Sequence, residues 1–176
     1  MAAFDPAADP DRDPVFRLMV NTFVTMFRRR ALLDETIAHL RSADYHVVPI
    51  ESFGWESPAA MHSDLARILD FPSYYGHNLD ALNDCLRDMA QDHRGWPAEA
   101  AGLVLVLLGY DSFAARHPAV AQAVLDIIAT QARTALVFGR RLFCLVQSDD
   151  PDLRFEPVGA TPVMWNDAEW LDAHRR

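Results

Sequence analysis

Apolar residues recur along this chain at two spacings, and stretches of the two kinds alternate. Steps of three and four residues predict helices over 31–43, 58–69, 78–90 and 118–136. Short apolar runs with β-branched members predict strands over 22–28, 46–50, 103–108 and 142–147. Strands that alternate with helices of this length are typical of parallel β-α-β units. We therefore expect an α/β fold, with a small parallel β-sheet flanked by helices.

Composition distinguishes some of these strands. The run LVLVLL at 103–108 is continuously apolar, as expected for a central strand that is buried on both faces. Pro49 has no backbone N–H to donate, so it suits an edge strand or a strand end better than the middle of a sheet. The run 15–27 is ambiguous between helix and strand, and we divide it into a short helix near 14–20 followed by the first strand.

Residues that start or stop helices agree with these ranges. Ser57 is a candidate N-cap, and Pro58 suits the first position of the helix that follows. Gly139 lies just past the expected end of the last long helix. Near the C-terminus, Asn166 and Glu169 have the spacing of a capping box, which predicts a short helix after Asn166.

The chain divides into three parts. Residues 1–13 are rich in Ala, Asp and Pro and should form a disordered tail, because they bury too little apolar surface to offset the entropy of ordering. Residues 14–148 should form a single α/β domain. Residues 149–176 are a loop-rich C-terminal extension that we expect to pack on that domain. Cys85 and Cys144 lie in apolar segments and are interpreted as buried free thiols.

Charge and hydropathy exclude several classes of protein. The 176-residue chain is about half hydrophobic, which is enough to bury a core. Its formal net charge of −9 argues against a general nucleic-acid binder, which needs clustered basic residues. The arginine triplet 28–30 is therefore interpreted as a solvated strand end. With neither a signal peptide nor an apolar run of roughly 18–20 residues, we expect a cytoplasmic protein without membrane contact.

A stretch near the middle of the chain, FPSYYGHNLDALNDCLRDM, predicts a helix with one apolar and one acidic face. The apolar residues at steps of three and four are Leu79, Leu82, Leu86 and Met89. They share one face, which should pack on the core. The roughly opposite face carries Asp80, Asp84 and Asp88, with Asn83 and Arg87 beside them. Asp80 and Asp84 lie about 6 Å apart along the helix axis, close to the spacing of neighbouring phosphates on a nucleic-acid strand.

The turn before this helix contains two adjacent tyrosines. Tyr74 and Tyr75 are costly to expose, so we expect one to pack inward and the other to stand beside the carboxylates as an interface anchor. Gly76 is expected to supply a backbone conformation that other residues resist. Asn78 should cap the helix and thereby set the direction of its carboxylates. His77 is a candidate for a pH-sensitive contact.

The ordered series in this stretch is formed by Pro72, Tyr74, Tyr75, Gly76, Asn78, Leu79, Asp80, Ala81, Leu82, Asp84, Cys85 and Leu86. It resembles the signature of the barstar family, the small intracellular inhibitors of secreted ribonucleases of the barnase type. The resemblance covers residues 45–148. It implies a barstar-like α/β fold, extended here by an extra N-terminal β-α unit and by the C-terminal segment.

The resemblance implies a protein inhibitor of the antitoxin or immunity type. Its acidic helix and the preceding Tyr-Gly loop would block the active site of a basic ribonuclease or ribonuclease-like toxin, with the carboxylates imitating RNA phosphate. The expected partner-binding residues are Tyr74, Gly76, His77, Asn78, Asp80, Asn83, Asp84, Arg87 and Asp88.

Two positions depart from the family pattern. The family prototype has a tryptophan just before the second aspartate, where this chain has Asn83. It also has a glutamate on the later helix that reaches the enzyme, where our alignment places Thr130. The chain therefore lacks one aromatic and one acidic contact of the prototype. The resemblance indicates the class of partner better than it indicates which partner.

Two other functions stay open at this point. Asp80 and Asp84 are candidates for the acid and base of an enzyme, or for ligands of Mg²⁺. The sequence has no Gly-rich phosphate loop, nucleophile motif or cluster at metal-ligand spacing, so we expect no enzyme, no cofactor and no metal site. Alternatively, the chain is a barstar-like interaction module with a different basic partner. The expected partner is a protein and not a nucleic acid.

Overall fold

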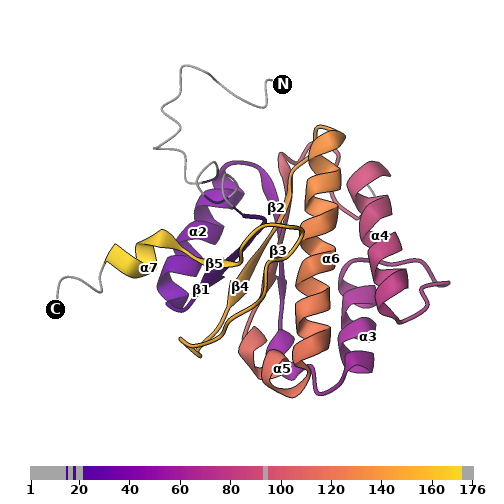
Figure 1. The fold of residues 1–176 in the computed structure, drawn as a ribbon. Coiled ribbons are helices and arrows are strands. Elements are labelled where there is room, and N and C mark those ends of the chain that lie inside the picture. The colour runs from indigo at the N-terminus through magenta and orange to yellow at the C-terminus, as the bar shows by residue number, and fades with distance from the viewer. Residues whose placement is uncertain (1–14, 16–17, 19–21, 93–94, 172–176) are drawn as a thin grey trace.

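The computed structural model describes residues 15, 18, 22–92 and 95–171, and it confirms the α/β fold. Its elements are β1 (Val24–Phe27), α2 (Arg30–Ser42), β2 (Tyr45–Ile50), η2 (Ser52–Gly54), α3 (Pro58–Ile68), α4 (Leu79–Asp92), β3 (Gly102–Leu107), α5 (Tyr110–Arg116), α6 (Pro118–Val137), β4 (Leu142–Gln147), β5 (Met164–Trp165) and α7 (Asp167–Leu171). The strands form one sheet in the order β2-β3-β4-β1-β5, and every neighbouring pair is parallel (Figure 1).

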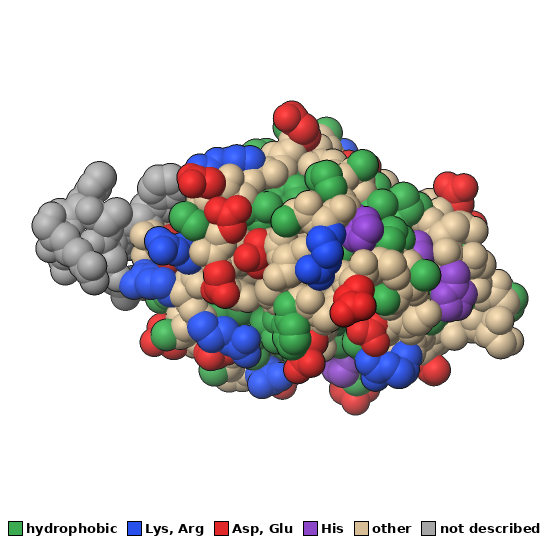
Figure 2. Space-filling model, turned by 90° about the horizontal axis from the view of Figure 1, so that it is seen from below, with side chains coloured by type: hydrophobic (Ala, Val, Ile, Leu, Met, Phe, Trp, Pro, Cys, Tyr) green, Lys and Arg blue, Asp and Glu red, His purple; other side chains and the backbone are tan. Residues whose placement is uncertain are grey.

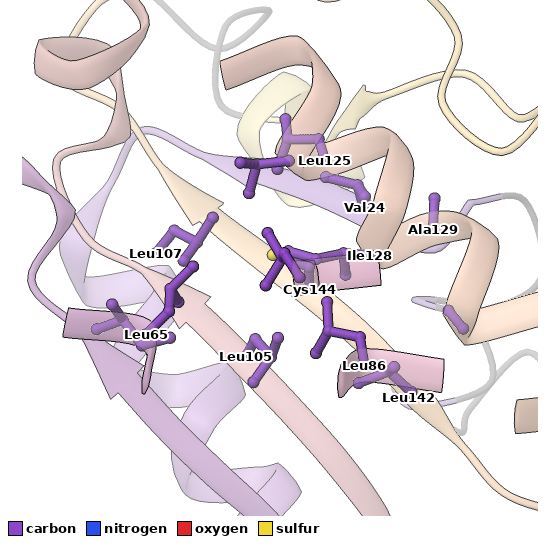
Figure 3. Close-up of a cluster of buried hydrophobic side chains, with 14 of the residues drawn as sticks. Val24, Leu65, Leu86, Leu105, Leu107, Leu125, Ile128, Ala129, Leu142 and Cys144 are labelled. Carbon is purple, nitrogen blue, oxygen red and sulfur yellow. The ribbon is translucent and has the colours of Figure 1, made fainter. Parts of the chain in front are cut away.

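The two central strands are buried on both faces. All six residues of β3 and all six of β4 are buried. Alternate residues of β3 point to opposite faces, so Leu103, Leu105 and Leu107 join one core cluster while Val104 and Val106 join another. The first cluster is covered by α3, α4 and α6 (Figure 3), and the second is covered by α2. The continuous apolar run in the sequence follows from this two-sided burial.

Most of the predicted elements are confirmed to within one or two residues. Ser57 caps α3 as expected, because its hydroxyl accepts a hydrogen bond from the Ala60 N–H at 3.2 Å, and Pro58 occupies the first turn. Pro49 lies in the edge strand β2, where its missing N–H costs no ladder hydrogen bond. Both cysteines are free and buried.

Several features differ from the sequence-based expectations. The structure adds α5, whose seven residues are too few for a clear helical period, and β5, which has only two residues. Helix α4 continues to Asp92, into the segment expected to be a loop. Of the helix expected near 14–20, Val15 and Leu18 are described as helical and buried. The rest of it, and the tail expected over 1–13, lie outside the described residues.

Helix α6 lies on the same face of the sheet as α3 and α4. By length and composition alone it could cross a membrane, but 44% of its most apolar window is buried inside the fold, and a core helix passes the same test. Its buried side packs on α4 and β4.

The segment after β4 runs along one side of α6 and returns to the sheet edge (Figure 1). Gln122 of α6 holds the backbone of this segment at Glu156. Its side-chain amide donates to the Glu156 carbonyl at 3.1 Å and accepts from the Glu156 N–H at 3.0 Å. Val158 is fully buried, and a Cβ on Gly159 would lie 3.0 Å from the Ala129 backbone. The segment then adds β5 alongside β1. It is therefore bound to both the helical layer and the sheet.

The capping box predicted at the C-terminus is only half formed. The Asn166 side chain accepts from the Ala168 N–H at 3.0 Å, as a cap does. The Glu169 carboxylate instead accepts from the backbone N–H groups of Arg28 and Arg29, each at 3.0 Å, and pairs with the Arg29 guanidinium at 3.1 Å. The prediction that this arginine triplet is a purely solvated strand end is therefore wrong for Arg29. The Glu169 carboxylate, which the local pattern assigned to the capping box, therefore makes a long-range contact with the chain between β1 and α2 instead.

Replacing Glu169 should weaken the attachment of the C-terminal segment. Glu169→Ala leaves two backbone donors without their acceptor, so we expect the free energy of unfolding to fall by about 1–3 kcal/mol. Urea denaturation of the full chain measures this change. Glu156→Ala is the control, because the exposed Glu156 makes its contacts to Gln122 through backbone atoms. Equal losses in the two variants would contradict the assigned role of Glu169.

Candidate functional site

Helix α4 begins where the sequence predicted, because Asn78 caps it. The Asn78 Oδ1 accepts from the Ala81 N–H at 2.8 Å, and its amide group donates to the Gly76 carbonyl at 3.2 Å. One side chain therefore fixes both the first turn of the helix and the loop that leads into it. The rotation of α4 about its axis, and with it the direction of every side chain on the helix, depends on this start.

The inner side of α4 is the predicted apolar face. Leu82, Leu86 and Met89 are buried, and the partly buried Leu79 packs against them. Cys85 is buried beside this face. Burial, with further contributions from Asp88 and Asp84, raises the pKa of the Cys85 thiol, so the thiol stays protonated and serves as a packing group. The helix is therefore held to the core along its whole length.

The outward side of α4 carries a narrower acidic surface than the sequence suggested. Asp80 and Asp84 are exposed, whereas Asp88 is half-buried. Arg87 is also exposed, and its Nη2 lies 2.9 Å from Asp84 Oδ1; their side chains are 45% and 59% exposed. We call Asp80, Asp84 and Arg87 the α4 outward face. One of its two exposed carboxylates is thus already paired within the helix.

Asn83 belongs to the contact between α4 and α6. Its Oδ1 accepts a hydrogen bond from Gln131 Nε2 at 2.7 Å. Gln131 is only 4% exposed, and its Oε1 has no hydrogen-bond partner. Thr130, the neighbour of Gln131, is exposed. Where the family prototype places a tryptophan, this chain therefore has a polar link between two helices.

The two tyrosines of the preceding loop separate as predicted. Tyr74 is 73% exposed, whereas Tyr75 is buried. The Tyr75 hydroxyl and His62 Nδ1 are joined by a hydrogen bond of 2.5 Å, and the rings of Phe71 and His77 lie 4.9 and 5.0 Å from the Tyr75 ring. Tyr75 thus anchors the loop, and its neighbour Tyr74 projects into solvent.

The glycine of this loop is required for a reason other than the one expected. Gly76 does not adopt a positive φ; the residue that does is His77, with φ of 50°. A Cβ on Gly76 would instead approach the Asn78 side-chain amide to 3.1 Å. The constraint on Gly76 is therefore space beside the capping side chain. The left-handed backbone at His77 turns the chain into the helix.

Burial at the base of the loop shifts two titratable groups. Desolvation, with a smaller contribution from His77, lowers the pKa of His62. Desolvation, with a contribution from Cys85, raises the pKa of Tyr75 above its usual range. Both shifts favour the neutral forms, so the hydrogen bond between these two side chains joins uncharged groups near neutral pH.

Sequence reasoning missed two residues of this site. His62 was not among the expected site residues, although Leu65 lies three residues after it, at helical spacing, and both are buried. Gln131 lies three residues after Ile128, on the inward side of α6, so helical spacing indicated that it is buried. Both residues act by supporting their neighbours in the site, a role that depends on contacts between elements.

The site lacks the arrangement of a metal centre within the part of the chain that the structure describes. No group of three or more His, Cys, Asp or Glu side chains is placed there to hold a metal ion. The carboxylates of the α4 outward face stand on an exposed helix surface, and the loop that precedes the helix carries the exposed ring of Tyr74. This arrangement suits charge-assisted hydrogen bonds to the surface of another protein.

The chain is similar in sequence to known proteins. A sequence model of the family described as Barstar (barnase inhibitor) matches residues 45–147. Over 37 residues, the chain is 54% identical to "Putative ribonuclease inhibitor YrdF" of Bacillus subtilis (strain 168). This match covers 21% of the present chain and 41% of the relative, so the chain spans less than half of that protein.

A more distant likeness is found among solved structures. The "Structure of Drosophila ORC bound to AT-rich DNA and Cdc6" is matched with a TM-score of 0.49 and 16% sequence identity. The match covers 90% of this chain and 56% of that chain. At these values the likeness bears on neither the fold nor the function.

The link between Asn83 and Gln131 should contribute to stability only as a pair. Asn83→Ala leaves the buried Gln131 amide without a partner, so we expect the free energy of unfolding to fall by about 1–3 kcal/mol. The double variant Asn83→Leu/Gln131→Leu removes both polar groups and should recover most of that loss. Denaturant unfolding of the single and double variants tests this expectation. A double variant that is no more stable than Asn83→Ala would show that the two amides act independently.

His62 should make stability depend on pH in a defined direction. Because its pKa is lowered in the folded state, the unfolded chain takes up the proton first. Stability should therefore be complete above about pH 6.5 and decline as the pH falls from there through the folded-state pKa of His62. The variant His62→Gln keeps a hydrogen-bonding side chain without titrating, so its unfolding free energy should decline less over this window. Parallel curves for the two proteins would rule out His62 as the source.

Proposed function

The chain belongs to the barstar family, and on this premise we propose that it inhibits a basic ribonuclease or a ribonuclease-like toxin. Helix α4 and residues 71–78 would cover the active site of the enzyme. The observation that carries this proposal is the presentation of Asp80 and Asp84. Both are exposed on a helix that Asn78 caps and the core holds, and the preceding loop exposes the ring of Tyr74.

Electrostatics supports this choice of partner. A ribonuclease needs a cationic site to hold the phosphates of RNA, and carboxylates can take the same charge-assisted hydrogen bonds from Arg, Lys or His. Asp80 and Asp84 are about 6 Å apart along the helix axis, so they can meet two neighbouring phosphate positions. Because the helix is packed before binding, little entropy is lost in placing them.

Tyr74 supplies the apolar part of the proposed contact. An exposed tyrosine offers a large, rigid surface with a hydroxyl at its tip, a combination that is enriched at protein interfaces. Its position is fixed by its neighbour, because Tyr75 is buried and hydrogen-bonded to His62. The loop therefore presents the aromatic ring from an anchored base.

Surface charge supports a protein partner over a nucleic acid. On the face shown in Figure 2, basic side chains are interspersed with acidic ones and do not form a basic area. Nucleic-acid binding depends on clustered Lys and Arg that contact phosphates. An inhibitor of this kind would act in the cytoplasm, where buried free thiols such as Cys85 and Cys144 stay reduced.

One observation favours a second candidate, a barstar-like module with another basic partner. Asn83 is bound to Gln131 and does not present an aromatic surface, and the exposed Thr130 carries no charge. Both positions contribute enzyme contacts in the family prototype. A target that does not need those contacts would still meet Tyr74 and the acidic residues.

The inhibitor proposal is tested by co-purification from the native cytoplasm and an RNA-cleavage assay with the captured ribonuclease. Loss of a charge-assisted hydrogen bond costs about 1.5–3 kcal/mol, so Asp84→Ala should weaken inhibition roughly 10- to 100-fold and flatten its salt dependence. Asp34→Ala is the matched control, because Asp34 is equally exposed and paired with Arg30 on the opposite side of the sheet. Equal inhibition by both variants would remove α4 from the interface.

A further inference from the structure

Arg87 lies at one end of the α4 outward face, the surface that is proposed to bind a cationic partner. Steps of four and three residues from Asp80 lead through Asp84 to Arg87, so the three side chains share one helical stripe. Arg87 is 45% exposed and is bound to Asp84 at 2.9 Å. A positive charge at this place is unexpected on a surface that recognises positive charge.

The charges along the α4 outward face follow a definite order. Asp80 is negative, Asp84 is negative and paired, and Arg87 is positive. At 1.5 Å per residue, Arg87 lies about 4–5 Å beyond Asp84 and about 10 Å beyond Asp80 along the axis. A partner with a uniformly cationic site would therefore place one of its charges against Arg87. A partner that carries a cation followed by an acceptor would match the whole face.

We propose that Arg87 is a specificity-determining residue of this face. In the free protein its guanidinium group forms an ion pair with the carboxylate of Asp84. On binding, a cationic side chain of the partner replaces Arg87 in the ion pair with Asp84. Arg87 then binds a carboxylate or carbonyl group that the partner presents beside that cation. This inference rests on the inhibitor function proposed above and describes the chemistry of the partner more closely.

Physical chemistry explains why this exchange discriminates between partners. The free ion pair is an exposed i,i+3 pair, which contributes little to stability and is easily opened. In a complex the same arginine loses water, and a guanidinium that is buried without an acceptor is strongly unfavourable. Arg87 therefore costs little in the free protein, but it penalises a partner that lacks an acceptor. Such selection by mismatch is a common source of specificity.

The chain contains a matched pair that serves as a control. Arg30 and Asp34 form an ion pair of 2.9 Å on α2, with side-chain exposures of 58% and 55%. Helix α2 covers the other face of the sheet from α4. Removing Arg30 changes the net charge of the protein as much as removing Arg87 does. The comparison separates an effect of position from an effect of total charge.

The test uses a catalytically inactive basic ribonuclease of the barnase type as the probe, with dissociation constants measured by calorimetry at low and high salt. Arg87→Ala should bind this cationic probe about two- to fivefold more tightly than the wild type at low salt. Arg87→Glu should bind more tightly still, and Arg30→Ala should change binding less than Arg87→Ala does. In the background of Asp84→Ala, the gain from Arg87→Ala should shrink, because the two side chains act as a pair.

Each outcome separates this inference from the inhibitor function. If Asp84→Ala weakens binding while Arg87→Ala and Arg30→Ala have equal effects, the inhibitor function stands and the role of Arg87 is overturned. If Arg87→Ala weakens binding while Arg30→Ala does not, the probe offers an acceptor to Arg87, and the assigned role of Arg87 is supported. If neither the wild type nor any variant binds the probe, the inhibitor proposal fails, and the inference falls with it.

Discussion

The two-sided burial of β3 and β4 is the constraint on which the rest of the structure depends. Every residue of these strands is buried, so each face of the sheet must be covered. Helix α2 covers one face, and α3, α4 and α6 cover the other. The inner side of α4 must then be apolar, and its outward side is free to carry charge. The core therefore decides which side of α4 faces outward, and that side carries Asp80 and Asp84.

Much of this arrangement could be predicted from the sequence because it depends on local period. The run at 103–108, the helical spacing of Leu82 and Leu86, and the cap at Asn78 are all local signals, and the structure bears them out. The contacts that were missed join residues far apart in the chain. Glu169 reaches Arg28 and Arg29, and its local capping pattern gave no indication of this. The short elements α5 and β5 are likewise too short to show a period.

The same distinction applies to the candidate site. Helical spacing correctly placed Asp80 and Asp84 on the outward side. It could not show that Arg87 forms an ion pair with Asp84 or that Asn83 accepts a hydrogen bond from Gln131. Gly76 was expected to supply a special backbone conformation, whereas the structure shows a steric constraint. Either constraint is met by a glycine, so the sequence alone does not distinguish them. Side-chain pairing decides which charges a partner meets, and it depends on the relative placement of whole helices.

The C-terminal segment affects the exposed edges of the sheet. Parallel strands at the rim of a sheet expose backbone groups that can template the addition of a foreign strand. Here one rim contains Pro49, which interrupts such a template. At the other rim, β5 covers the middle of β1, and the Asn166 N–H bonds to the Met26 carbonyl just beyond it. Because β5 itself has only two residues, the new rim is too short to guide assembly. The two-residue strand β5 therefore leaves little unpaired backbone at this rim of the sheet.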